Sequence, residues 1–397
     1  MRNRSLLFLK AHPLILQIGW KVVRVILRLV SVFTPIHEKT VLFSSFGGRK
    51  FDDSPKAIYE EMCRNETFRD WEFIWAFTNP KSFDIPRGRK VKIDTKEFFA
   101  ALLSSQVWVG NSGIDRGLRL KKKGVVKVET WHGTPLKKIL GDENQNAIGG
   151  KQRLEKAHTT DNTTIRCAQS EYDKKLFTRL FHADPSCILL SDLPRNDELV
   201  HYDSGKIQTV KKRLGIDEGK TVILYAPTYR EYLINENRET YIAPPIHLKK
   251  WKERLGDNYI LLLRAHYAVT AAIDISGQDF VIDVSNYPSL NDLYLISDLM
   301  ISDYSSTFFD YSILDRPMFC FAYDLDEYEE KRGLYLNLEE TLPCPVDRDE
   351  DSLLNHIVNR DEREYRRKAA TFHARFAPYA GNASRCVVET IIKRLKG

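Results

Sequence analysis

Short apolar runs recur along most of the chain, separated by stretches in which apolar residues return every three or four positions. Runs of about five apolar residues are typical of strands buried in a parallel sheet, and the amphipathic stretches are typical of helices that cover it. We therefore predict an α/β protein built from βαβ units. The predicted strands are 40–45, 71–78, 107–109, 125–129, 165–168 and 187–191 in the first half, and 220–225, 259–264, 280–283, 299–302 and 318–322 in the second.

The alternation stops at residues 192–197, which read Asp-Leu-Pro-Arg-Asn-Asp and are rich in turn-forming types. A chain of 397 residues is also too long for one ordinary core. We predict a first domain over 38–195 and a second over 196–375. A C-terminal helical segment, 376–397, is expected to return to the first domain.

Residues 1–37 differ in character from the rest of the chain. Between 6 and 33 the chain is strongly apolar, and its uninterrupted apolar runs are far shorter than the roughly 20 residues of a spanning helix. The pattern predicts an amphipathic helix lying in a membrane interface, with basic side chains reaching anionic headgroups. A signal peptide or spanning segment, and a helix packed on the protein itself, are the alternatives. The polar residues share one predicted helical face: Lys10, Gln17, Lys21, Arg24, Arg28 and Ser31.

The net charge of +6 comes from the segment that contains this predicted helix. Residues 1–37 contain six lysines and arginines and no acidic residue, which equals the whole excess. The remaining chain is formally neutral, which argues against nucleic acid as a partner. Six cysteines are scattered without a C-x-x-C pair, a pattern typical of buried thiols in a reducing compartment.

The segment 130–138, Thr-Trp-His-Gly-Thr-Pro-Leu-Lys-Lys, joins a predicted strand to a predicted helix. Gly133 permits the turn, Thr134 suits an N-cap, and Pro135 suits the first helical position. His132 would then lie at the carboxyl end of a strand, where open α/β sheets bind ligands, and it can accept a proton near neutral pH. The alternative is a turn histidine that only hydrogen-bonds the backbone.

Polar residues follow other predicted strands in the second half. Ser305 and Ser306 precede a predicted helix, whose free N–H groups could hold a phosphate or pyrophosphate. Arg264 and His266 lie two residues apart at another strand end and could add positive charge to the same anion. The alternatives are serines that only cap the helix and an arginine that pairs with a surface carboxylate.

Neither a P-loop nor a dinucleotide fingerprint occurs in the chain. The sequence Asp324-Leu325-Asp326 resembles a metal-binding D-x-D, but it lies in an acidic run. We interpret it as a solvated loop and predict neither a metal site nor a cofactor.

Five segments in this order resemble the CDP-glycerol glycerophosphotransferase family of wall teichoic acid synthesis. They are T-W-H-G-T-P-L-K at 130–137, P-R-N-D at 194–197, Y-A-P-T-Y-R at 225–230, R-A-H at 264–266, and S-D-Y-S-S with Asp310 at 302–310. The resemblance covers about residues 40–390. It implies a GT-B-like fold of two Rossmann-type doubly wound domains facing across a cleft. It also implies peripheral attachment to the cytoplasmic face of a bacterial cell membrane.

The resemblance implies transfer of glycerol phosphate from CDP-glycerol to a hydroxyl of a polyprenyl-diphosphate-linked saccharide or growing chain, with release of CMP. His132 and His266 fall on catalytic positions of the family. One departure is Leu193, where we expect a glycine before Pro-Arg-Asn-Asp. The residues on substrate-binding positions are Trp131, Gly133, Thr134, Arg195, Pro227, Thr228, Arg264, Ser305, Ser306 and Asp310.

Within the family, the short basic helix ahead of the catalytic unit is closest in layout to the teichoic acid glycerol-phosphate primase. A CDP-ribitol ribitolphosphotransferase and a poly(glycerol phosphate) polymerase are alternatives inside the family. A glycosyltransferase or sugar-nucleotide epimerase of the same fold, and a non-catalytic membrane-bound nucleotide-binding protein, are alternatives outside it.

Overall fold

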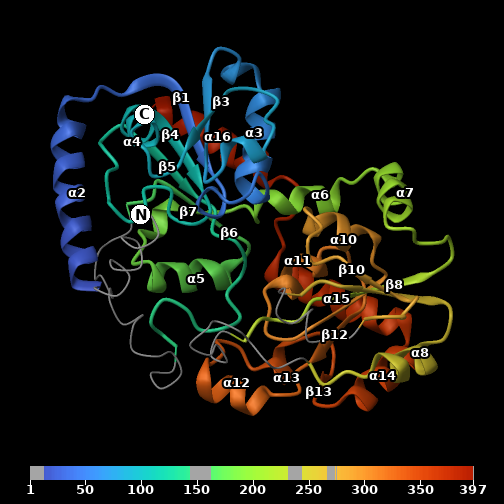
Figure 1. Cartoon of the computed structure of the whole chain (residues 1–397). Helices are drawn as coiled ribbons and strands as arrows, with labels where there is room; N and C mark the ends of the chain where they lie inside the picture. Colours follow the sequence, from blue (N-terminus) through green and yellow to red (C-terminus); the bar gives the residue numbers. More distant parts are fainter. Residues whose placement is uncertain (1–12, 144–161, 231–243, 266–272, 274, 397) are drawn as a thin grey trace.

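Two open sheets form the framework of the molecule (Figure 1). The computed structural model describes residues 13–143, 162–230, 244–265, 273 and 275–396. Within these residues every pair of neighbouring strands in either sheet is parallel, and helices flank both sheets. The prediction of an α/β protein with two parallel sheets is therefore confirmed.

The first sheet has the strand order β3-β2-β1-β4-β5-β6-β7. Alternate side chains of β1 enter different cores, because Val41 and Phe43 pack on one face of the sheet and Leu42 packs on the other. A strand buried on both faces is apolar throughout, which explains the runs in the sequence. The strands are β1 (His37–Ser44), β2 (Glu72–Phe77), β3 (Arg89–Lys92), β4 (Ser105–Gly110), β5 (Val126–Glu129), β6 (Ile165–Ala168) and β7 (Ile188–Leu190).

The second sheet has the strand order β10-β9-β8-β11-β12-β13 and its own hydrophobic core. Its strands are β8 (Thr221–Tyr225), β9 (Tyr259–Leu263), β10 (Val281–Asp283), β11 (Leu299–Ser302), β12 (Met318–Phe321) and β13 (Val346–Asp347). Its helices are α7 (Ser204–Arg213), α8 (Leu248–Leu255), α10 (Leu290–Ile296), α11 (Thr307–Ser312), α12 (Leu325–Lys331), α13 (Leu338–Thr341), α14 (Glu350–Val358) and α15 (Glu362–Phe376).

The C-terminal helix α16 (Ala383–Lys396) leaves the second sheet and packs beside α3 (Asp53–Arg64) on the first (Figure 1). Asp197, at the start of α6 (Asp197–Val200), accepts hydrogen bonds from Ala383 N and Ser384 N, both at 2.7 Å. A carboxylate at a helix N-terminus satisfies free N–H groups and favours the helix dipole. The chain thus crosses between the sheets twice, at η5 (Pro194–Asn196) and again before α16.

The remaining short elements connect strands of the first sheet. They are α4 (Lys96–Ser104), α5 (Glu171–Leu180), η1 (Phe46–Gly48), η2 (Glu66–Phe68), η3 (Pro80–Ser82) and η4 (Pro185–Cys187).

The helix predicted to begin at Thr134 and Pro135 does not form, so this prediction is wrong. Instead Lys137 makes an antiparallel bridge with Leu334 of the second domain. Lys138 N donates to Gly333 O at 2.9 Å, so this backbone group is bonded across the domains and not within a helix. The local sequence around Lys138 gives no signal for a partner almost two hundred residues away.

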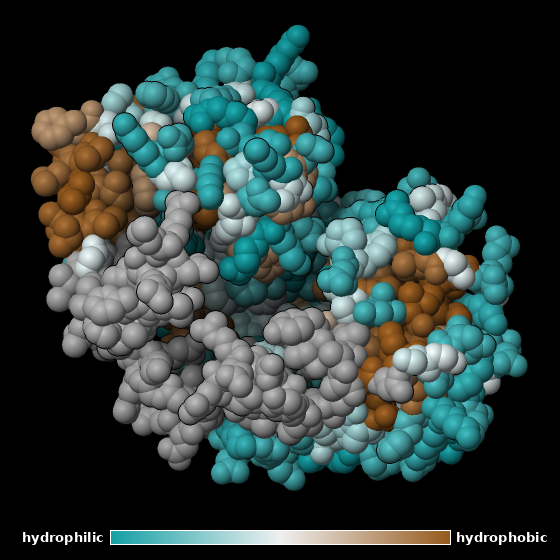
Figure 2. Space-filling view, in the orientation of Figure 1, coloured by the Kyte–Doolittle hydropathy of each residue, from teal (hydrophilic) through white to brown (hydrophobic). Residues whose placement is uncertain are grey.

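Helix α2 (Pro13–Phe33) lies along the outer flank of the first domain (Figure 1). Arg24 Nη2 donates to Gly117 O at 3.3 Å, so a polar side chain of the helix faces the protein. Figure 2 shows an apolar surface over this helix. No helix in the described part of the chain is both long enough and apolar enough to cross a membrane. The exposed apolar side chains, 46–85% accessible, are Val22, Val25, Ile26, Leu29, Val30, Val32 and Phe33.

Substituting Ile391→Ala on α16 should lower the free energy of unfolding by about 3 kcal/mol, because the side chain is fully buried against the first sheet. Urea unfolding measures this loss. Lys393→Ala on the exposed face of the same helix is the matched control and should change stability by less than about 0.5 kcal/mol. Equal effects of the two variants would contradict the packing of α16 on this core.

Candidate active site

His132 lies just after β5, on a loop of the first domain that extends to contact the second. Its Nδ1 is 3.0 Å from Asn111 O. A carbonyl oxygen only accepts, so Nδ1 carries the proton and the Nε2 of the neutral ring keeps a free lone pair. The Trp131 ring stacks on the imidazole at 4.2 Å between centroids, which limits how the imidazole can rotate.

Burial lowers the pKa of His132 below its ordinary value of 6.5, and the positive charge of Arg195 lowers it further. The hydrogen bond to Asn111 and the negative charge of Asp53 act in the opposite direction without reversing the shift. The neutral ring, which can accept a proton, is therefore the form present at neutral pH.

Asn111 positions this histidine, and the sequence patterns did not identify it as a site residue. Its side chain is fully buried. Asn111 Oδ1 accepts from Phe46 N at 2.8 Å, and Nδ2 donates to Asp53 Oδ1 at 3.1 Å. One amide thus joins the ends of β1 and β4 to the start of α3. The Gly-Asn-Ser sequence after β4 was the available signal, but a strand-end asparagine is usually only a turn residue.

Gly133 brings the histidine loop against the second domain. Its φ is 146°, and a Cβ there would lie 2.6 Å from Ser306 Oγ, so no larger residue fits without displacing the serine loop. Ser305 instead caps α11, because its Oγ accepts a hydrogen bond from Thr307 N at 3.2 Å. The predicted base and one of the two predicted phosphate-binding serines therefore lie on loops in direct contact.

Arg195 links the two domains through a buried pair of carboxylates. Its Nη1 is 2.6 Å from Asp53 Oδ2 in the first domain, and its Nη2 is 2.7 Å from Asp310 Oδ2 in the second. Burial opposes the charged guanidinium, but Asp310 and Asp53 outweigh it and raise the pKa of Arg195. The Nη2 atom would lie 3.7 Å from a Cβ on Gly133, so this charge also lies beside the histidine loop.

Leu193, where we expected a glycine, causes no strain before Pro194. Its φ is −90°, which any residue adopts, and its side chain is buried in the core of the first domain. The departure from the family pattern therefore leaves the backbone at Arg195 undisturbed.

Two predicted substrate-binding residues are enclosed by protein. The Thr134 hydroxyl lies 2.8 Å from Gln169 Oε1 and 2.9 Å from Asp173 Oδ2. Asp310 accepts from Arg195 and, at 3.0 Å, from Asn196 Nδ2. Both are buried, so we assign them the role of supporting the site and not of touching a ligand.

The carboxyls behind this loop are held in a poorly solvated environment. Burial raises the pKa of Asp173 to about 7 and that of Asp192 to about 8. Proximity of the Asp310 charge adds to both shifts. A raised pKa means that folding favours the protonated form, so the stability these groups contribute is present at acidic pH and is lost as the pH rises through 7 and 8.

On the second domain, Thr228 follows β8 and lies over the start of the serine loop. Its N donates to Asp303 Oδ1 at 2.9 Å, and Pro227 before it is buried. The Thr228 Oγ1 atom is buried and has no hydrogen-bond partner among the residues that the structure describes. An unsatisfied buried hydroxyl at a strand end is a candidate ligand contact, because leaving it unpaired costs free energy.

Arg230 holds these strand ends together and was not predicted as a site residue. Its side chain is only 3% exposed. It donates to Asp303 Oδ2 at 2.9 Å, to Thr228 O at 2.6 Å, and to both carboxylate oxygens of Asp324 at 2.7 and 2.9 Å. The carboxyl ends of β8, β11 and β12 are therefore joined through one guanidinium.

The interpretation of Asp324 as part of a solvated loop is wrong. Its side chain is 12% exposed, pairs with Arg230 and accepts from Tyr304 OH at 2.8 Å. Asp326, two residues on, is exposed, so only the first aspartate of the D-x-D is structural. No group of three or more His, Cys, Asp or Glu side chains within the described ranges could hold a metal ion.

Arg264 is turned toward a neighbouring loop of the second domain. Its Nη1 donates to Tyr287 O at 2.8 Å and to Val284 O at 3.2 Å. Burial lowers the pKa of Arg264. The predicted partner His266 lies outside the described residues, so the arrangement expected for this pair stays a prediction.

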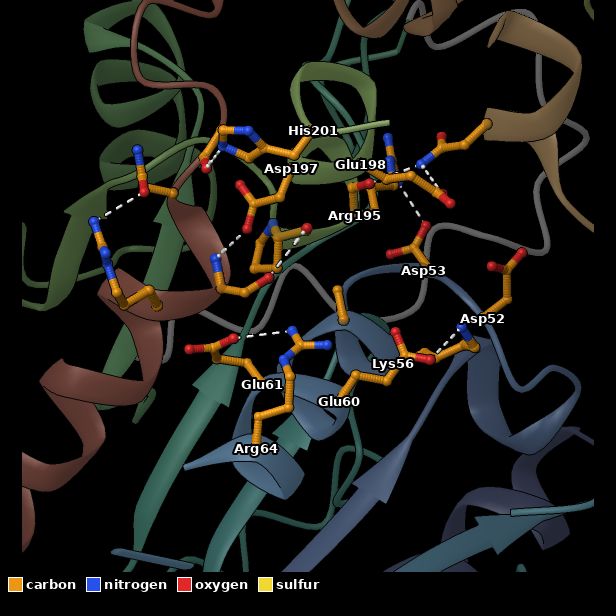
Figure 3. Close-up of a pocket in the computed structure, with 17 residues that line it drawn as sticks. Asp52, Asp53, Lys56, Glu60, Glu61, Arg64, Arg195, Asp197, Glu198 and His201 are labelled. Atoms are coloured by element: carbon orange, nitrogen blue, oxygen red, sulfur yellow. Dashed lines mark hydrogen bonds and ion pairs between the residues drawn. The ribbon is translucent and has the colours of Figure 1, made fainter. Parts of the chain in front are cut away.

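A cavity of about 470 Å³ opens where α3, the 194–201 segment and the start of α16 meet (Figure 3). It shares Asp53 and Arg195 with the surroundings of the histidine, but neither that histidine nor the two serines line it. Oppositely charged side chains in its wall pair with one another, as Lys56 and Glu60 do at 2.7 Å. The cavity therefore lies at the junction of the domains.

The family model described as CDP-Glycerol:Poly(glycerophosphate) glycerophosphotransferase matches residues 26–393. The teichoic acid poly(glycerol phosphate) polymerase of Staphylococcus epidermidis is 36% identical over 373 residues, which are 91% of this chain and 51% of the polymerase. The teichoic acid glycerol-phosphate transferase of Staphylococcus aureus is 33% identical over 376 residues, which are 90% of this chain and 94% of the transferase. The chain thus spans about half the length of the first relative and nearly all of the second.

Solved structures agree with these sequence relatives. The wall teichoic acid polymerase TagF matches with a TM-score of 0.82 and 33% identity, covering 100% of this chain and 98% of that chain. A UDP-GlcNAc 2-epimerase from Neisseria meningitidis matches with a TM-score of 0.53 at 13% identity over 89% of this chain and all of the epimerase, and shares the fold alone. With its family match spanning nearly the whole two-domain unit, the chain belongs to the CDP-glycerol:poly(glycerophosphate) glycerophosphotransferase family.

Proposed function

We propose that the chain transfers glycerol phosphate from CDP-glycerol to a hydroxyl of a polyprenyl-diphosphate-linked saccharide or growing teichoic acid chain, and releases CMP. The observation that carries this proposal is the position of His132. Its free Nε2 lies on a loop that contacts the Ser306 loop of the second domain. An imidazole base beside a candidate phosphate-binding loop suits transfer of a substituted phosphate group to a hydroxyl.

In the proposed reaction, His132 Nε2 takes the proton of the acceptor hydroxyl while the hydroxyl oxygen attacks the phosphorus that bears glycerol. A new P–O bond to the acceptor forms, the P–O bond to the CMP phosphate breaks, and CMP leaves with the electron pair. A positioned base typically contributes 10²- to 10⁴-fold to the rate, and positioning and charge stabilisation supply much of the rest.

Donor binding is assigned to the second domain. The unpaired Thr228 Oγ1 and the Ser306 hydroxyl provide hydrogen-bonding groups at neighbouring strand ends. Arg195 adds positive charge from between the domains. A histidine variant of the related polymerase TagF, whose structure resembles this chain with a TM-score of 0.82, has been soaked with CDPG, which supports a CDP-alcohol donor here.

We further propose that α2 attaches the enzyme to the cytoplasmic face of the membrane. Its apolar side chains are exposed over one face, as Val32 at 76% and Phe33 at 85% illustrate. Burying such a surface in the headgroup region is favourable. A lipid-linked acceptor stays in the bilayer, so attachment would confine enzyme and acceptor to the same surface.

Substituting His132→Ala should lower kcat for CMP release by at least about a hundredfold, because the proton acceptor is lost. The dissociation constant for CMP should change less than twofold, because CMP is bound by the other domain. In the wild type, kcat/KM should decline on the acidic side only below pH 6.5, since burial lowers the pKa of this base. Unchanged turnover in the variant would remove His132 from the mechanism.

The same assay identifies the donor. CDP-glycerol, CDP-ribitol and UDP-sugars are each supplied with a lipid disaccharide acceptor, and CMP or UDP release is measured. Release from CDP-glycerol alone is expected. Release from a UDP-sugar alone would contradict the proposed function, and release from CDP-ribitol would correct the transferred alcohol.

Replacing the buried carboxylate Asp324→Asn should weaken CMP binding by at least about fivefold. If this side chain acts by holding Arg230 and the strand ends in place, its loss disorders the donor loops. If charge alone mattered, removing a negative group near a phosphate site should tighten binding. Isothermal titration with CMP distinguishes the two outcomes, and the weaker binding supports the positioning role.

Arg360→Met is the control for that measurement. Arg360 has a 16% exposed side chain in the same domain and bonds to Glu362 and Tyr259, near the amino end of β9. Its loss should lower thermal stability and leave CMP affinity within twofold of the wild type.

Removing residues 1–33 should abolish co-sedimentation with vesicles that contain phosphatidylglycerol, because the exposed apolar face of α2 is removed. Turnover on a water-soluble acceptor should persist, since α2 contributes nothing to the described site. A truncated protein that still sediments with the vesicles would contradict membrane attachment through α2.

A further inference from the structure

A group of basic side chains lies on the rim of the first sheet, beside His132. Arg49 and Lys50 belong to the loop after β1, and within the described residues neither side chain makes a hydrogen bond or an ion pair. Lys50 Nζ lies 5.4 Å from the centroid of the Phe46 ring, and that ring lies 5.9 Å from the His132 ring. These cations are therefore on the loop that packs against the proposed base.

A third cation, Arg116, reaches the same loop from the loop that follows the neighbouring strand β4. Arg116 donates from Nε and Nη2 to the two carboxylate oxygens of Asp94, at 2.9 and 3.1 Å. This bidentate pair fixes the guanidinium and leaves Nη1 directed elsewhere. β1 and β4 are adjacent in the sheet, so the loops that follow them meet at its carboxyl edge.

The two guanidinium groups approach Gly47 from different loops and leave between them a gap about as wide as one methyl group. The φ of Gly47 is 62°, and a Cβ there would lie 3.6 Å from Arg116 Nη1 and 3.9 Å from Arg49 Nη1. Two positive groups that face one small gap repel each other unless an anion lies between them. Asp94 neutralises only the far edge of Arg116, so the gap itself keeps positive charge.

The gap also lies on the side of the domain where α2 is attached. Arg24 of that helix bonds to Gly117 O, directly after Arg116. Helix α2 and the proposed base thus both lie close to the basic group, through Arg24 and through Phe46. A phosphorylated molecule that extends from a membrane surface toward His132 would pass the gap.

We propose that Arg49 and Arg116, facing each other across Gly47, bind a phosphate group of the acceptor. The inference rests on the proposed function, which supplies the acceptor. The ligand group would be a phosphate ester with free oxygens. Such a group occurs both in the diphosphate of a lipid-linked saccharide and in the phosphodiesters of a glycerol phosphate chain. The planar guanidinium suits such oxygens because it donates two parallel hydrogen bonds.

The test fills the gap without removing either arginine. Gly47→Asp puts a carboxylate between the two guanidiniums, and Gly47→Asn puts a neutral side chain of the same size there. Both residues tolerate a positive φ, and a Cβ at this position makes only ordinary contacts, with the ends of two long side chains. Arg69→Gln is the control, because this exposed arginine pairs within the described residues only with Glu66. It lies before β2, at the amino edge of the sheet.

In the full chain, Gly47→Asp should raise KM for the acceptor at least tenfold, and Gly47→Asn should raise it less. Both should leave KM for CDP-glycerol and the dissociation constant for CMP within twofold of the wild type. A merely structural effect of the substitutions would change donor and acceptor parameters together. Acceptor KM values that match those of the wild type and of Arg69→Gln would overturn the proposal.

Binding measurements identify the source of the phosphate. Geranyl diphosphate, a synthetic tri(glycerol phosphate) and phosphatidylglycerol vesicles are titrated separately into each protein. Loss of geranyl diphosphate or tri(glycerol phosphate) binding in Gly47→Asp supports the site and names its ligand. Loss of vesicle binding alone would overturn it in favour of a general membrane contact. Because binding needs no turnover, these titrations test the phosphate site even if the enzyme does not use CDP-glycerol. Absence of CDP-glycerol transfer would refute the proposed function and not the phosphate site.

Discussion

The burial of one guanidinium between two carboxylates is the interaction on which the site depends. Arg195 leaves water to pair with Asp53 on the first domain and Asp310 on the second. Removing Arg195 would leave two buried carboxylates without a positive partner, which is far more costly than losing an exposed ion pair. The guanidinium thereby links the domains next to Gly133, where the histidine loop contacts Ser306. The same charge disfavours protonation of His132 and helps to keep it a base.

A second buried arginine organises the donor side in the same manner. Arg230 joins three strand ends through Asp303 and Asp324, and the nearby Thr228 hydroxyl has no hydrogen-bond partner within the described ranges. In both places a largely buried guanidinium holds the loops, since the side chains of Arg195 and Arg230 are 13% and 3% exposed. Preorganised dipoles and charges of this kind are what phosphoryl transfer chiefly requires.

The sequence predicted features that depend on local pattern and missed those that depend on distant partners. Strands such as β1 and β8 could be found because burial on both faces of a sheet requires continuous apolar runs. The helix expected after Thr134 was wrong, because the backbone there pairs with Gly333. Asp324 was read as solvated, since the arginine that buries it is remote in sequence. For Asn111, the pattern located the strand end but could not reveal its partners.

The central claim is that a neutral imidazole in one domain deprotonates the acceptor beside a donor held by the other domain. Measuring the protonation state of His132 tests it most directly. Nitrogen-15 NMR of histidine-labelled protein, assigned by comparison with His132→Gln, reports which ring nitrogen carries the proton. At pH 7 we expect a proton on Nδ1 and a free lone pair on Nε2, with protonation of Nε2 only below pH 6.5. We also expect the Nε2 resonance to shift when CMP is added. A ring protonated on Nε2 at pH 7, or an Nε2 resonance that does not shift when CMP is added, would contradict the proposed role of His132.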